Sequence, residues 1–271
     1  MNRSIENAGS SAAHQVAGWV PPVARAGYAA KGVVYVLLGY IAFTAAMASG
    51  QPEGASGALQ SLVDESGGHL MLMLIAVGLL AHVIWRMVQA VLDPEHREHG
   101  AKRVFMRLFY ALSAVIYGSL AYTAWQLSRQ GQTDGGNGTE IWIARLLDKP
   151  FGTWLVMAAG VGIIGYGIHQ LIKAARGDVN RRMTTSNATT SRAVRAIGRI
   201  GTAARGVVLL PIGWFVFKAG RSYSAATAAD TGEVLQMLER GGLLAAVGLG
   251  LLAYGVHQIA KAVYRRIERP D

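Results

Sequence analysis

The stretch GTWLVMAAGVGIIGYGIHQLIKAA, from Gly152 to Ala175, is almost entirely apolar and carries one formal charge, at Lys173. As a helix it is long enough to cross a hydrocarbon core of about 30 Å. Five further segments share this character: Gly32–Ala48, Leu70–Leu92, Phe105–Leu127, Ala203–Ala219 and Gly241–Val263. The chain is therefore predicted to be an all-α polytopic membrane protein with six transmembrane helices.

The composition supports this fold class. Of the 271 residues, 52% are hydrophobic and 15% are charged, whereas about 25% are charged in soluble domains. The polar first 24 residues predict a retained first span without a cleavable signal peptide. The chain has no cysteine, which rules out disulfides and thiolate metal sites. Walker, dinucleotide, HExxH and GxSxG motifs are absent from the sequence, so we expect no enzyme and no catalytic residues.

The basic residues predict the orientation in the membrane. The chain has 26 Lys and Arg residues, and 20 of them fall in alternate loops and the adjoining span ends. The other six are Arg129, Arg145, Lys149, Lys218, Arg221 and Arg240. Because Lys and Arg near span ends stay on the inner side, we expect both termini in the cytoplasm.

Three stretches spaced along the chain resemble one another. RAGYAAKGVVY, RLFYALSAVIY and RIGTAARGVVL begin at Arg25, Arg107 and Arg199. Three later stretches also align, AHVIWRMVQ at 81–89, GYGIHQLIK at 165–173 and AYGVHQIAK at 253–261. The sequence thus predicts three two-helix repeats of the same orientation, related by a pseudo-threefold axis along the membrane normal.

This pattern divides the chain as follows: a polar cytoplasmic arm (1–24), repeat 1 (25–92), a cytoplasmic loop (93–106), repeat 2 (107–175), a basic cytoplasmic loop (176–198), repeat 3 (199–264) and a tail (265–271). Each outer loop holds a short amphipathic patch before Gly68, Gly152 or Gly241, where we expect a short helix on the outer face. The basic loop predicts an interfacial helix with Ser191 as its N-cap.

With these motifs, RxGYxAKGVVY at the start and GYGxHQxxKA at the end of a repeat, the chain resembles the bacterial membrane family called domain of unknown function 1206. The resemblance covers about Arg25 to Lys261 and implies an integral protein of the bacterial plasma membrane without an assigned activity. Repeat 2 departs from the first motif at Ser113, which replaces a basic residue. Repeat 1 departs from the second at Trp85 and Arg86, which replace His and Gln.

Polar side chains of both motifs fall at one depth, because odd spans begin and even spans end at the cytoplasm. The set comprises Lys31, Arg86, His169, Gln170, Lys173, Arg205, His257, Gln258 and Lys261. Ionisable groups inside spans often mark a solute path, which predicts a polar vestibule facing the cytoplasm. The same groups could instead anchor and pack the helices, since Lys and Arg extend to the interface and His and Gln bond between helices, or they could bind lipid headgroups.

These observations favour a non-enzymatic structural or interaction protein, with a small ion or solute channel or transporter as the alternative. The expected partners are the lipid bilayer and anionic headgroups on the cytoplasmic side, with a protein partner as an open alternative and no nucleic acid.

A haem held by His169 and His257 and a zinc ion held by the loop 93–100 are weaker hypotheses, and we expect no cofactor and no metal. Ala158 with Gly162 and Ala246 with Gly250 predict close helix packing.

Overall fold

The computed structural model describes residues 2–48, 54–91, 101–131, 138–180, 183, 188–229, 231–240 and 242–265. Six long helices dominate it: α1 (Asn2–Ala48), α3 (Gly68–Val91), α4 (Ala101–Gln130), α6 (Gly152–Arg176), α7 (Ala188–Ser222) and α9 (Leu244–Tyr264). The short helices are α2 (Ala55–Gln60), α5 (Gly138–Leu147) and α8 (Thr231–Arg240), with 3₁₀ turns η1 (Asp178–Asn180) and η2 (Ala225–Thr227). The described part of the chain contains no strand beyond one isolated bridge between Met183 and Arg265.

Each long helix contains a segment long and apolar enough to cross a membrane: Pro21–Met47, Gly68–Val91, Met106–Gln130, Gly152–Arg176, Thr189–Ser222 and Leu244–Tyr264. Their outward faces are apolar as well; on α3, Leu74, Val77 and Leu80 are more than half exposed. Apolar surface on this scale is unsuited to water and suited to lipid. The prediction of an all-α protein with six membrane-spanning helices is confirmed.

Two helix starts differ from the sequence-based expectation. The first span begins at Pro21 rather than Gly32, and α1 itself extends back to Asn2. The prediction of Ser191 as the N-cap of a separate interfacial helix is wrong, because α7 runs without interruption from Ala188 to Ser222 and contains Ser191. The basic segment before the span is rich in Ala and Arg, which are strong helix formers, so the helix continues through the expected boundary.

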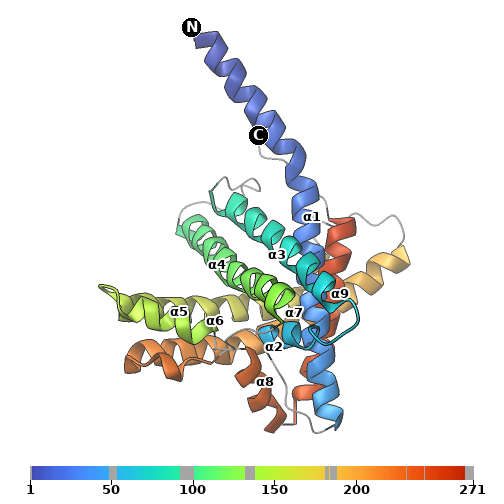
Figure 1. Ribbon diagram of the computed structural model, residues 1–271, viewed down its shortest axis with the longest axis vertical. Helices are drawn as coiled ribbons and strands as arrows, with labels where there is room; N and C mark the ends of the chain where they lie inside the picture. The colour runs from blue at the N-terminus through green and yellow to red at the C-terminus, as the bar shows by residue number, and fades with distance from the viewer. Residues whose placement is uncertain are drawn as a thin grey trace.

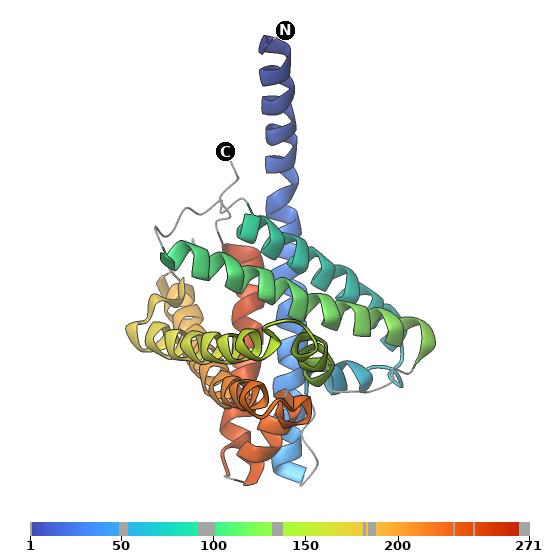
Figure 2. The same ribbon diagram turned by 90° about the vertical axis from the view of Figure 1, so that its left-hand side faces the viewer.

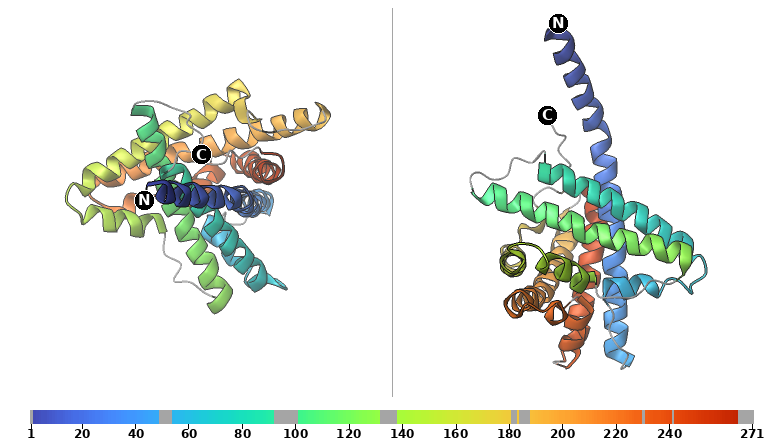
Figure 3. Two further views of the ribbon diagram at one scale, coloured as in Figure 1. Left: turned by 90° about the horizontal axis from the view of Figure 1, so that it is seen from above. Right: turned by 60° about the vertical axis from the view of Figure 1, so that its left-hand side comes forward.

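The long helices form three antiparallel pairs, and each pair joins two different repeats. α3 packs on α4, α6 packs on α7, and α1 packs on α9. In Figure 1 the α1/α9 pair stands upright, while α3 with α4 and α6 with α7 run across it in other directions. The quarter-turn view in Figure 2 and the view from above in Figure 3 show the same splayed arrangement. The first turns of α1 project beyond the other helices (Figure 1).

Contacts within a repeat complete most of a ring. α1 packs on α3, and α7 packs on α9, but α4 and α6 have no comparable contact. At one level the rings of Phe109 and Tyr166 do stack across these two helices, with centroids 3.9 Å apart. The six helices therefore form a ring whose weakest side lies between the two helices of repeat 2.

Glycines at seven-residue spacing bring two of the pairs close together. Gly160 and Gly167 on α6 face Gly213 and Gly206 on α7. Gly248 and Gly255 on α9 face Gly39 and Gly32 on α1. A Cβ at Gly160 would lie 2.5 Å from the backbone nitrogen of Phe217. The predicted packing positions are offset from the real ones by two residues, since Ala158 and Ala246 are exposed. Of the predicted small residues, Gly250 does pack closely, on Ala204.

The short helices close the end of the ring away from the start of α1 and the end of α9 (Figure 1). α2, α5 and α8 lie where short outer helices were expected, and α2 and α5 precede the glycines Gly68 and Gly152. Gly241 lies outside the described residues. The apolar residues of these helices are buried in the protein: Leu59 and Leu235 are fully enclosed, and Ile143 nearly so. The three short helices therefore seal the helix ends rather than lying loosely on a surface.

Candidate functional site

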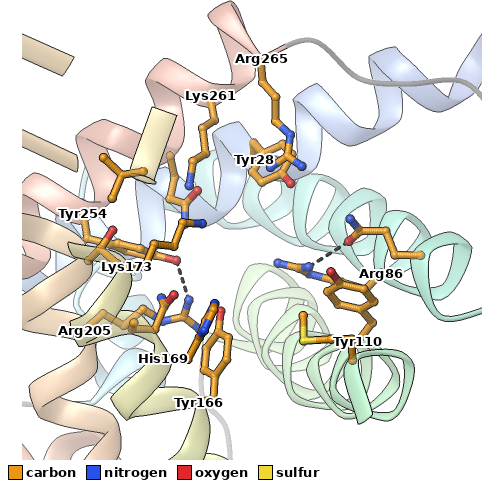
Figure 4. Close-up of a pocket in the computed structure, with 16 residues that line it drawn as sticks. Tyr28, Arg86, Tyr110, Tyr166, His169, Lys173, Arg205, Tyr254, Lys261 and Arg265 are labelled. Carbon is orange, nitrogen blue, oxygen red and sulfur yellow. Dashed lines mark hydrogen bonds between the residues drawn. The ribbon is translucent and has the colours of Figure 1, made fainter. Parts of the chain in front are cut away.

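At the opposite end of the ring the helices enclose a chamber of about 100 Å³, with room for several water molecules. It lies where α3, α6 and α9 end, near the start of α4 and midway along α7, so side chains far apart in sequence meet there (Figure 4). The residues that line the chamber are Tyr28, Arg86, Gln89, Met106, Tyr110, Tyr166, His169, Gln170, Lys173, Val179, Thr202, Arg205, Tyr254, Gln258, Lys261 and Arg265.

Seven of the nine residues that the sequence nominated for a vestibule line this one chamber. They are Arg86, His169, Gln170, Lys173, Arg205, Gln258 and Lys261. The other two, Lys31 and His257, are buried elsewhere in the packing. The structure thus brings most of the polar layer to one space, which an arrangement built only for helix packing does not require.

The second long helix of each repeat (α3, α6 or α9) contributes one cation and one amide to the chamber. Repeat 2 supplies Gln170 and Lys173, and repeat 3 supplies Gln258 and Lys261 at the equivalent positions. Repeat 1 supplies Arg86 and Gln89, so that the cation stands where the other repeats have the amide and the amide where they have the cation. The departure of repeat 1 from the shared motif is therefore an exchange of positions that keeps both kinds of group.

Several lining residues were not among the nominated ones. Tyr28, Tyr110 and Thr202 each stand three residues after the arginine that opens a repeat. Their equivalent positions in the three repeats were a signal that could have found them, as was the alignment of Gln89 with Lys173 and Lys261. Arg265 carries no such signal, because it lies just beyond the end of the aligned stretch.

The described lining is strongly positive. It contains five Lys and Arg side chains, Arg86, Lys173, Arg205, Lys261 and Arg265, and no Asp or Glu. Figure 4 shows Arg86 reaching in from one side and Arg205 and Lys261 from the other. Cations gathered in one space repel one another, and burying a charge is unfavourable. An anion in the chamber would offset both effects.

Arg205 is the most deeply held of these cations, with 9% of its surface exposed. Its Nη1 donates a short hydrogen bond to the hydroxyl of Tyr254, whereas its Nε is buried without a hydrogen-bond partner among the described residues. The guanidinium lies 5.0 Å from the ring centroid of Tyr254 and 5.6 Å from those of Tyr35 and Tyr166. Aromatic rings stabilise a cation, yet they leave its formal charge uncompensated.

Arg86 is positioned from within its own helix. Its Nη1 donates to Oε1 of Gln89 at 2.9 Å, and its Nε lies 3.3 Å from Nε2 of His82. The guanidinium also packs 5.3 Å from the ring centroid of Tyr110 on α4. These contacts come from positions three and four residues away on one helix and from a neighbouring helix, so they fix Arg86 at the chamber wall.

Lys31 lies behind the wall of the chamber, with 1% of its surface exposed. Its Nζ is 4.5 Å from the ring centroid of Tyr117, 5.9 Å from that of Tyr35 and 5.8 Å from that of Tyr254. Tyr35 and Tyr254 also contact Arg205. Two cations from different repeats therefore share the same two tyrosine rings, with Arg205 on the chamber side of them.

The two histidines of the haem hypothesis do not share a site. His169 is exposed and lines the chamber, whereas His257 is enclosed against α7, where a Cβ at Gly198 would lie 2.5 Å from its Cε1. A bis-histidine haem needs both imidazoles in one pocket, so the arrangement does not fit the group. The zinc hypothesis concerns the loop 93–100, which lies outside the described residues; within them, no three His, Cys, Asp or Glu side chains cluster as metal ligands do.

Two of the arginines that open the repeats cap the helix before them. Arg107 donates to the carbonyl oxygens of Ala90 and Val91 at the end of α3. Arg199 donates in the same way to Ala174 and Ala175 on α6, at 2.9 and 3.3 Å. Cationic donors satisfy the last carbonyls of a helix and complement its dipole. Arg25 is exposed, and the described residues offer it no equivalent bond.

Comparison with known proteins gives the same picture of three repeats. The family described as Domain of Unknown Function (DUF1206) matches the chain in three regions, 26–93, 108–177 and 200–265. The chain is also similar to the uncharacterized protein YxxB of Bacillus subtilis (strain 168), with 33% identity over 259 residues, 92% of each chain. No solved structure matches.

Proposed function

The chain belongs to the DUF1206 family, and we propose that this membrane protein binds a small anionic solute in the chamber, as the substrate site of a transporter. The observation that carries the proposal is the described lining of the chamber, with five cations and no carboxylate. An anion is the ligand that such a site selects, because only a negative charge lowers the repulsion among the cations.

The proposal places the chamber on the cytoplasmic side of a bacterial plasma membrane, with both termini in the cytoplasm. The uneven distribution of Lys and Arg supports this orientation. Arg192 and Arg195 on the first turns of α7 are exposed, which suits contact with anionic lipid headgroups at that surface. The relative in a bacterium agrees with the bacterial assignment.

The proposed role is binding rather than catalysis. The described lining consists mainly of cations, amides and phenols. It offers no carboxylate that could act as a general base or stabilise another group in that role. His169 is the lone imidazole of the described lining. This combination is suited to holding a ligand and neutralising its charge.

The test measures anion binding by purified protein in nanodiscs of a neutral lipid. Multivalent anions, added at constant ionic strength against chloride, are expected to raise the unfolding midpoint, because a ligand at a hundredfold excess over its Kd stabilises by about 2.7 kcal/mol. The shift should disappear in Arg205→Gln and persist in Arg221→Gln, which changes an exposed cation in the last turn of the same helix. Equal responses in the two variants would contradict the chamber as the site.

Uptake of the stabilising anion into proteoliposomes tests the transport part. Wild-type protein is expected to accelerate uptake of the labelled anion over empty liposomes, and Arg205→Gln is expected to abolish that acceleration. Binding without uptake would make the chamber a receptor site and would contradict a transporter.

The second candidate is a structural or interaction protein without a solute. The burial of Lys31 and His257 favours it, since both polar side chains of the predicted layer serve packing rather than the chamber. This candidate predicts no stabilisation by any anion and a protein partner that stays bound through purification.

A further inference from the structure

We infer that the ligand of the chamber carries a tetrahedral oxyanion, a terminal phosphate group whose three outer oxygens face the three repeats. This inference rests on the proposed function and specifies its substrate class. It follows from the pseudo-threefold placement of the polar groups rather than from their total charge.

The donors that line the chamber come in equivalent sets of three. Arg86, Gln170 and Gln258 occupy one repeat position, and Gln89, Lys173 and Lys261 occupy the position one helical turn further on. Residues three apart lie on the same face of a helix, so α3, α6 and α9 each present both of their groups to the same space. The result is a cation and an amide from each of three directions.

A terminal phosphate has the matching symmetry. Its three outer oxygens are equivalent about the bond to the fourth oxygen, so each can accept from the amide and the cation of one repeat. Charge-assisted bonds of this kind to phosphate are short and strong. A carboxylate offers two oxygens in a plane and would leave the donors of one repeat without an acceptor, and chloride offers a single atom.

The size and charge of the chamber agree with this ligand class. A space of about 100 Å³, with room for several water molecules, is large enough for a phosphate group. A phosphate monoester carries about −1.5 to −2 charges at neutral pH, which suits a lining that includes Arg86, Arg205 and Lys261 better than a single negative charge does. His169 is exposed while it lines the chamber, so the space is open there and the rest of a larger ligand can extend outward.

The same chemistry could come from free phosphate, from a soluble phosphate monoester or from a lipid with a terminal phosphate. Unfolding midpoints of the full-length protein distinguish these sources. Inorganic phosphate and glycerol phosphate are added to protein in neutral nanodiscs, with acetate and chloride at the same ionic strength as references. A second set of nanodiscs contains phosphatidic acid, which has a terminal phosphate, or phosphatidylglycerol, which has a phosphodiester.

The inference expects a higher midpoint with phosphate or glycerol phosphate if the source is soluble, and with phosphatidic acid over phosphatidylglycerol if the source is a lipid. An equal effect of acetate or chloride would overturn the phosphate assignment and leave anion binding intact. An equal effect of the two lipids, without an effect of soluble phosphate, would overturn it as well. No effect of any anion or lipid would remove both the inference and the proposed function.

Variants of the amide positions test the threefold placement. Gln170→Leu and Gln258→Leu are each expected to weaken phosphate binding by about tenfold or more, since each removes a hydrogen bond to a charged ligand. Gln236→Leu, at an exposed position on α8, is the matched control and should bind as wild type does. Gln258→Glu should abolish the phosphate effect and raise the midpoint without ligand, because its carboxylate supplies the missing negative charge. If the chamber variants bind phosphate as the control does, the threefold assignment is wrong.

Discussion

At the scale of single residues, two deeply buried cations are held by tyrosines where a carboxylate would be expected. Lys31 and Arg205 share the rings of Tyr35 and Tyr254. A ring over a cation contributes about 0.5–2 kcal/mol, less than the several kcal/mol needed to bury the charge. Both side chains therefore reduce the stability of the protein, and for Arg205 the proposed anion in the chamber would provide the compensation.

Lys31 lies outside the chamber lining, so its burial has no such compensation. Lys31→Met keeps the length and apolar stem of the side chain and removes the charge. We expect it to stabilise the empty protein by about 1–4 kcal/mol, since replacing buried charges by well-packed apolar groups is often stabilising. Thermal unfolding in detergent measures the change.

Lys31→Ala is the comparison, because it removes the same charge but leaves a cavity, and it should be clearly less stable than Lys31→Met. If Lys31→Met proves as destabilising as Lys31→Ala, the ammonium group has a favourable role at this position that the tyrosine contacts alone do not explain.

At the scale of helices, the three pairs differ in how closely they approach. In the α1/α9 and α6/α7 pairs, glycine faces glycine at two levels. The equivalent positions of the α3/α4 pair hold Ala76 and Val83 on one helix and Ala114 and Ala121 on the other. Backbones that meet at glycine approach closely and gain dispersion contacts, so the bulkier side chains hold α3 and α4 further apart.

Two glycines of α6 give a matched test of this packing. A Cβ at Gly160 would lie 2.5 Å from the backbone of Phe217, whereas a Cβ at Gly165 would meet nothing within 4 Å. We expect Gly160→Ala to destabilise the protein by about 1–3 kcal/mol, as overpacking does, and Gly165→Ala to cause no loss. Both variants are compared with wild type by thermal unfolding in one detergent. Equal stability of the two variants would show that the close contact is not a source of stability.

At the scale of the whole molecule, the ring of helices is polar at one end and sealed at the other. The chamber lies at the end of the ring where α3, α6 and α9 finish. The short helices close the opposite end with buried apolar residues. Between them lies an apolar core that includes Val34, Leu72 and Leu127. This arrangement agrees with the proposed transporter, whose chamber would be reached from one side of the membrane.

The chain contains no cysteine, so single cysteines can report its orientation. Ser66→Cys lies between α2 and α3, Asp178→Cys lies just after α6, and both positions are exposed. In intact cells a membrane-impermeant maleimide is expected to label the cysteine at 66, and to label the cysteine at 178 only after permeabilisation, because the positive side stays inside. The reverse pattern would invert the proposed orientation, and labelling of both in intact cells would contradict six spans.

The sequence by itself determined the six apolar helices and the three repeats, because the length of an apolar run and the recurrence of a motif are local properties of the chain. It also placed the polar groups at a common depth, since successive spans alternate in direction. Only the tertiary structure decided which of those groups face one space: Lys173 and Lys261 line the chamber, while Lys31 and His257 are enclosed in packing. That outcome depends on the rotation and crossing of each helix, which glycine contacts between different repeats fix, and no single segment contains that information.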